Sequence, residues 1–163
     1  MNERPGGVLR QVIAIFMIAA FVWFVVIILV ERWALLENIQ PLGNTSIDDW
    51  VDDFMIASIY TFWLTIFFVL LWYVLTLYVF NVVKPMDGNK RGVWIGMGVA
   101  AGILSAFCGV ELLERPDSNV IWPYLLFPGN SLLIYYWSTL LATPGPFKYI
   151  PWGARVLRPY RLL

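Results

Sequence analysis

The amino-acid sequence predicts an all-α polytopic membrane protein with four transmembrane helices and both chain ends on the cytoplasmic side. Three observations lead to this fold class. Of the 163 residues, 60% are hydrophobic and only 13% are charged, whereas a soluble domain has about 25% charged residues. Four apolar runs contain no charged residue, and each is long enough to cross a bilayer, which takes about 20 residues. The basic residues gather on one side of these runs.

The four predicted spans form one membrane domain over residues 1–163. They cover about residues 11–30, 54–83, 92–110 and 120–143. Backbone groups in lipid must bond within their own segment, so each span is expected to be an α-helix. The first span is expected to remain as an uncleaved anchor, because Glu31, Arg32 and Trp33 follow it instead of a small-residue cleavage site.

The lysines and arginines predict the orientation. Nine of the 11 lie on the side of both chain ends: Arg4, Arg10, Lys84, Lys90, Arg91, Lys148, Arg155, Arg158 and Arg161. The other side carries only Arg32 and Arg115, together with nine of the 11 acidic residues. By the positive-inside rule both termini are cytoplasmic, and we expect the cytoplasmic (inner) membrane of a bacterium. The outer face is strongly negative.

A short amphipathic helix is predicted on the outer surface, running into the second span. One helical face carries apolar residues at i, i+3, i+4 and i+7, namely Ile47, Trp50, Val51 and Phe54. Ser46, directly before them, suits the N-cap. The opposite face carries four acids, Asp48, Asp49, Asp52 and Asp53. We interpret them as a solvated face. The alternatives are a dock for a basic partner or a cation site, although calcium prefers more varied oxygen ligands on a loop.

The second span is longer than a bilayer requires, since its predicted residues 54–83 extend about 45 Å as an α-helix, so it is expected to tilt or protrude. One of its faces carries the hydroxyls of Ser58, Thr61, Thr65 and Thr76. Such hydroxyls bond to a neighbouring helix or to carbonyls of their own helix. The alternative is a polar path lined by Thr61, Thr65, Thr76 and Asn130, but no ionisable residue accompanies the stripe.

The third span has the clearest packing pattern. Gly98, Gly102 and Ala106 are spaced four apart, and Gly92 and Gly96 add a second pair. Small residues at this spacing let two helix backbones approach closely. We therefore expect this helix to be the most enclosed of the four or to contact another subunit. Its single cysteine, Cys108, is expected to be a buried small apolar residue.

Pro128 and Gly129 interrupt the fourth span, because proline removes a backbone hydrogen bond and clashes with the preceding turn. We expect a kink or break near residues 127–130, with the freed carbonyls satisfied by Asn130 or Ser131. The alternative is a broken helix that marks a transport site. The tail, residues 144–163, is aromatic and basic. Its Trp152, Arg155, Arg158 and Arg161 suit lipid headgroups or a partner protein.

The residue types that the chain lacks exclude several classes of catalytic and metal-binding site. The chain has no histidine and a single cysteine, which removes His-based metal ligation and Ser-His or Cys-His catalysis. No phosphate-binding loop or hydrolase motif is present. We therefore expect no enzyme activity, no catalytic residues and no metal or cofactor site. The net charge of zero gives no general attraction to nucleic acid.

The function predicted from these features is that of a non-catalytic subunit that packs into and helps assemble a larger membrane complex for secretion, transport or envelope work. Its expected partners are membrane lipids and other integral membrane proteins or copies of itself. The alternative is a small oligomeric channel or carrier whose negative outer vestibule attracts cations. A membrane enzyme built on the aspartate cluster ranks last, because no nucleophile, base or recognisable ligand set accompanies the carboxylates.

Overall fold

The computed structural model of the chain describes residues 5–35, 47–79, 87–112 and 122–142. All of these residues are helical, and none of them forms a strand. The helices are α1 (Pro5–Trp23) continued by the π-helix η1 (Phe24–Leu35), α2 (Ile47–Val74) continued by η3 (Leu75–Val79), α3 (Asp87–Leu112) and α4 (Trp122–Ala142). The all-helical architecture expected from the sequence is therefore present.

The first helical segment extends beyond its predicted range at both ends. It is α-helical to Trp23 and then continues to Leu35 with i→i+5 hydrogen bonding. The prediction ended the span at Val30, where the apolar run ends. Glu31 is buried and bonds to Asn130 of α4, which keeps this part of the chain packed on the bundle. The helix therefore continues past this charged residue.

The amphipathic segment before the second span is not a separate helix. It forms the first turns of α2, which runs without interruption from Ile47 to Val74. Trp50, Val51 and Phe54 are buried, and together with Ile27 and Phe127 they form one apolar cluster. This packing holds the segment in line with the rest of α2. The predicted amphipathic helix therefore runs into the second span as expected, and its place on the outer membrane surface stays a prediction.

The fourth helix is continuous where a kink or a break was expected, so the break is absent and the kink stays a prediction. Pro128 lies inside α4, and the helix runs through it to Ala142. Asn130 and Ser131, expected to satisfy freed carbonyls, instead bond to side chains of other segments. The predicted break is therefore not present, and the proline is accommodated within a helix that neighbouring helices support on several sides.

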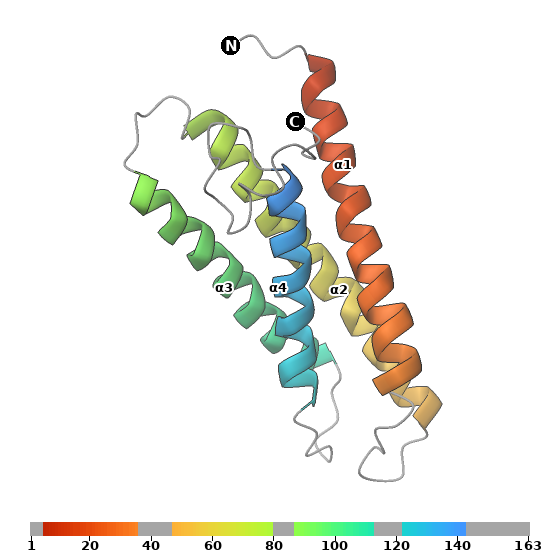
Figure 1. The fold of residues 1–163 in the computed structure, drawn as a ribbon. Coiled ribbons are helices and arrows are strands. Elements are labelled where there is room, and N and C mark those ends of the chain that lie inside the picture. The colour runs from red at the N-terminus through yellow and green to blue at the C-terminus, as the bar shows by residue number, and fades with distance from the viewer. Residues whose placement is uncertain (1–4, 36–46, 80–86, 113–121, 143–163) are drawn as a thin grey trace.

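The helices alternate in direction along the bundle, so that the start of α1 and the end of α4 lie at the same end (Figure 1). We call this the basic end, because Arg10, Lys90 and Arg91 lie there, and the opposite end, where α2 begins, the acidic end. The central element is α4, which packs against α1, α2 and α3. The first half of the prediction for α3, that it is the most enclosed helix, is therefore not met among the described residues, because α4 and not α3 packs against the three other helices. The second half, a contact of α3 with another subunit, stays a prediction.

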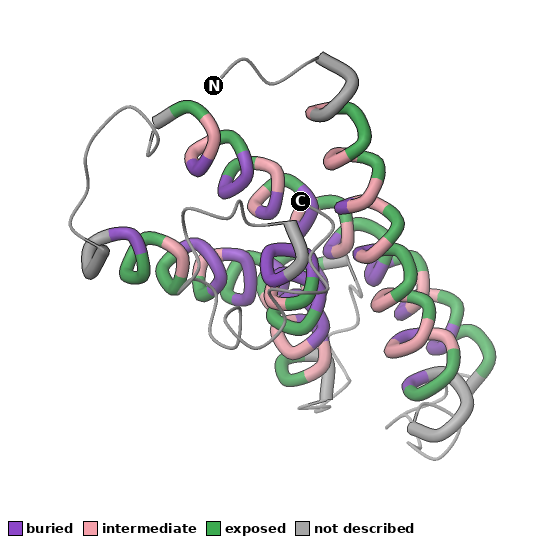
Figure 2. The backbone as a smooth tube through the Cα atoms, turned by 45° about the horizontal axis from the view of Figure 1, so that its top comes forward, coloured by how far each residue is buried: buried purple, intermediate pink, exposed green. Residues whose placement is uncertain are grey.

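Three apolar clusters fill the interior from the basic to the acidic end. The first is built around Trp72 and Tyr135, the second around Ile66 and Ile134, and the third around Phe54 and Phe127. Figure 2 shows buried positions recurring along each helix, with exposed positions between them.

The outside of the bundle is as apolar as its interior. Large side chains that are more than half exposed include Phe21, Trp63, Phe67, Phe107 and Leu125. Exposed apolar surface of this extent would drive aggregation of a soluble protein. Three helical stretches, Val8–Glu31, Asp48–Tyr78 and Lys90–Glu111, are long and apolar enough to cross a membrane. The chain thus has the character of an integral membrane protein.

Candidate functional site

A buried carboxyl group is the most unusual feature of the interior. Glu31 is 2% exposed, and its carboxylate accepts a hydrogen bond from the Asn130 side-chain amide at 3.0 Å. Glu31 comes from η1 and Asn130 from the third turn of α4. Ionisable groups buried at membrane depth are rare and mark functional positions by default, so this pair is a candidate site.

The sequence prediction missed Glu31, which it placed in a solvated outer loop beyond a charge-free span. The sequence does contain a pattern that includes Glu31. Apolar residues recur every four positions at Ile15, Ala19, Trp23 and Ile27, and Glu31 is the next position in that series. Ile15, Ala19, Ile27 and Glu31 are all buried. The prediction that no ionisable residue lies within the spans is therefore wrong, since the first apolar helix includes Glu31.

Hydroxyl groups from three helices meet beside this pair. Ser131 of α4 bonds to Thr65 of α2 at 2.7 Å and to Ser105 of α3. The same Thr65 hydroxyl also lies 2.8 Å from the Thr61 carbonyl, one turn earlier. We call this group the polar seam, comprising Ser58, Thr61, Thr65, Ser105 and Ser131. All five residues are buried.

The polar seam is closed and largely satisfied internally. Ser58 and Thr61 donate to the carbonyls of Met55 and Ser58 in their own helix. Thr76, predicted to belong to the same path, lies apart and donates to the Tyr73 carbonyl. Hydroxyls bonded in this way hold helices together. Both predicted kinds of hydrogen bond are present: bonds between hydroxyls of different helices, and bonds from a hydroxyl to a carbonyl of its own helix.

A second set of polar contacts ties the helices together at the basic end. The Trp94 indole N–H donates to the Thr139 hydroxyl at 3.0 Å, and the Tyr135 hydroxyl donates to the Trp94 carbonyl at 3.1 Å. Tyr73 donates to the Gln11 side chain, linking α2 to α1. Sequence reasoning did not anticipate these contacts, because each depends on which helices are neighbours.

Three glycines of α3 lie directly against α4. A Cβ added at Gly98 would stand 3.0 Å from the Tyr135 ring, and one added at Gly102 would contact Leu132 and Pro128. A Cβ at Gly109 would overlap the Phe127 ring. Ala106, predicted to continue this series, is only half-buried, and Ser105 takes the inward position.

The other two predicted packing glycines have no neighbours among the described residues. A Cβ added at Gly92 or Gly96 would meet nothing within 4 Å. Both residues are exposed, as are Val99 and Ile103, which continue the same stripe at helical spacing. We call Gly92, Gly96, Val99 and Ile103 the open face of α3.

The four aspartates at the start of α2 lie at or near the surface of the bundle. Asp48, Asp49 and Asp52 are exposed and Asp53 is half-buried. Among the residues that the structure describes, no group of three His, Cys, Asp or Glu side chains is placed to hold a metal ion. The arrangement matches a solvated helix face beside buried apolar residues.

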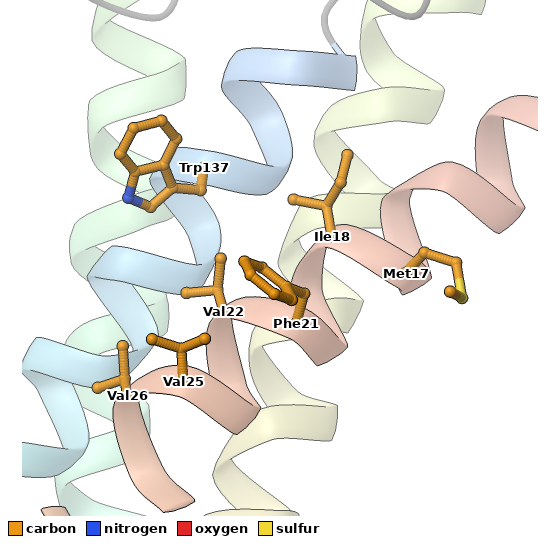
Figure 3. Close-up of a pocket in the computed structure, with 7 residues that line it drawn as sticks. All are labelled: Met17, Ile18, Phe21, Val22, Val25, Val26 and Trp137. Atoms are coloured by element: carbon orange, nitrogen blue, oxygen red, sulfur yellow. The ribbon is translucent and has the colours of Figure 1, made fainter. Parts of the chain in front are cut away.

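An apolar groove lies between α1 and α4 near the middle of the first span. Its volume is about 480 Å³, and its lining residues are Met17, Ile18, Phe21, Val22, Val25, Val26 and Trp137. Figure 3 shows Trp137 reaching it from α4, whereas the other six side chains come from the first helix. We call this surface the α1–α4 groove. The sequence analysis did not single it out.

Two further predictions concern Cys108 and the tail of the chain. Cys108 is exposed and forms no disulfide, so the expectation of a buried cysteine is wrong; it lies on the outer side of α3. The predicted tail contacts, Trp152, Arg155, Arg158 and Arg161, lie outside the described residues.

Comparisons with protein-family models, curated proteins and solved structures found no match to this chain.

Proposed function

We propose that this chain is a non-catalytic integral membrane subunit that binds a transmembrane helix of a partner protein through the open face of α3. The observation that carries the proposal is the contrast among the glycines of α3. Gly98, Gly102 and Gly109 pack against α4, whereas a Cβ added at Gly92 or Gly96 would meet no described residue within 4 Å. Glycine costs a helix about 1 kcal/mol relative to alanine, and close approach of another backbone offsets that cost.

A helix suits this surface better than lipid tails do. Glycines four residues apart form a shallow groove into which a second helix backbone fits, and small residues at this spacing are typical of transmembrane helix contacts. Lipid tails can pack against side chains of any size, so glycines at these positions would not improve their packing. The exposed Val99 and Ile103 continue the stripe and would pack beside such a helix. The partner is either another integral membrane protein or a second copy of this chain.

The closed polar seam favours a subunit over a channel or carrier. Its five residues are at most 3% exposed, and each takes part in a bond within the bundle. A cation path would need carbonyl or hydroxyl oxygens that face water. Thr76, from the predicted path, bonds only to its own helix.

We further propose that α4 is a fourth span and that both termini are cytoplasmic. The 21 residues of α4 carry no charge and extend about 31 Å, close to the thickness of the hydrocarbon. The alternating helix directions (Figure 1) and the arginines and lysines of the basic end support this topology. The expected location is the cytoplasmic membrane of a bacterium.

Reporter fusions test the topology. Green fluorescent protein fused after Leu163 is expected to fluoresce, and alkaline phosphatase at the same position is expected to be inactive, because the C-terminus faces the cytoplasm. A phosphatase fused within residues 113–121 serves as the control and is expected to be active. Active phosphatase at the C-terminus would place that end outside the cytoplasm and would contradict the proposal.

Site-specific photo-crosslinking tests the proposed partner contact. A photoreactive phenylalanine analogue at Val99, on the open face of α3, is expected to form an adduct with a membrane protein in native membranes. The matched control is the same analogue at Phe67 of α2, which is also exposed but has no neighbouring glycines. Adducts of equal yield from both positions would contradict a defined contact on α3.

A further inference from the structure

The α1–α4 groove differs in chemistry from the open face of α3. Every lining residue is aliphatic, aromatic or a thioether, and none is glycine, alanine or serine. Transmembrane helices dock where small residues let backbones approach, and this surface has none. Met17 and Phe21 are about two-thirds exposed. A thin, flexible hydrocarbon chain can lie between such side chains and Trp137, whereas a second helix cannot come close.

A positive charge lies on the same side of the helix as the groove. Arg10, Met17 and Phe21 are separated by seven and four residues, which places them on one face of α1. Arg10 is exposed and stands about 10 Å along the helix axis from Met17. This spacing puts a guanidinium at the level of the headgroups when the groove lies among the acyl chains.

We propose that the α1–α4 groove binds a membrane phospholipid with an anionic headgroup, one acyl chain lying against Phe21, Val22 and Trp137 and the phosphate at Arg10. Guanidinium groups recognise phosphate oxygens through paired hydrogen bonds, and anionic lipids concentrate at the cytoplasmic surface. The inference goes beyond the proposed function, because the groove and the open face of α3 lie on different helices and no partner protein is needed.

Native mass spectrometry of the purified full chain tests this site. Phosphatidylglycerol and phosphatidylcholine with identical acyl chains are supplied in equal amounts. The wild-type chain is expected to retain one lipid, with at least a fivefold preference for phosphatidylglycerol. Val25→Trp fills the groove and is expected to reduce retention of both lipids at least fivefold. Arg10→Gln is expected to retain a lipid but to lose the preference.

Two controls separate this site from general lipid adhesion. Ile59→Trp adds the same side chain at an exposed position of α2 and is expected to retain lipid like the wild type. If Val25→Trp does not fold, phosphatidylglycerol with a diazirine in its acyl chain is expected to label the peptides containing Phe21 and Trp137 in the wild type. Unchanged retention in Val25→Trp, an unchanged preference in Arg10→Gln, or labelling spread evenly over all exposed helices would overturn the proposal.

Discussion

Replacing Asn130 by leucine is expected to lower the free energy of unfolding by about 2 kcal/mol, within the range for leaving the partner of a buried hydrogen bond unsatisfied. The amide of Asn130 donates to the Glu31 carboxylate at 3.0 Å, and Glu31 is almost fully buried. Leucine has a similar size but no donor, so the carboxylate would stay out of water without its partner. The effect is measured by chemical unfolding in detergent micelles.

Companion variants separate the charge from the packing. Glu31→Gln keeps a hydrogen-bonding group of the same shape and is expected to change stability by less than about 1 kcal/mol. The double variant Glu31→Leu with Asn130→Leu removes both polar groups, so it is expected to be more stable than Asn130→Leu alone. If the two single changes add without coupling, the pair contributes nothing specific to stability.

Replacing Gly109 by valine is expected to destabilise the bundle by about 2–3 kcal/mol, at the upper end for overpacking a filled interior. A Cβ at this position would overlap the Phe127 ring. The ring is fully buried and stacks on Phe54 with a centroid distance of 4.8 Å, so it has no free space into which to move. Relief would require separating α3 from α4, which are neighbours along much of their length.

The matched control for this change is Gly96→Val in the same helix. A Cβ at Gly96 meets nothing within 4 Å, so the isolated chain is expected to keep its stability, because valine has a better helix propensity than glycine. Thermal unfolding of both variants in the same detergent makes the comparison. Equal midpoints for the two variants would contradict the close packing of Gly109 on Phe127.

The sequence alone predicts the four described helices, because a run without charged residues makes up most of each one. It also predicts the two faces at the start of α2, where Trp50 and Phe54 are buried and Asp48 and Asp52 are exposed. Both properties are local, since they follow from composition and from the period of a helix. The glycine spacing of α3 likewise indicates close packing without saying which helix is the neighbour.

Features that depend on tertiary contacts are harder to predict. Glu31 continues the four-residue series of the first helix, but its partner Asn130 lies 99 positions later and is identified only once the helices are placed together. Pro128 looks like a helix break until α4 is found at the centre of the bundle, where three helices support it. The α1–α4 groove exists only because Trp137 lies across from the first helix.

The central claim is that the open face of α3 binds a partner helix, and purification from native membranes tests it most directly. The tagged wild-type chain, expressed at its natural level and extracted with its lipids, is expected to co-purify with a defined integral membrane protein or as a homo-oligomer. Gly96→Leu is expected to lose that partner while remaining folded, whereas Ala20→Leu, which introduces the same side chain at an exposed position of α1, is expected to keep it. A wild-type chain that purifies as a lone monomer, or a Gly96→Leu variant that retains the partner in full, would contradict the claim.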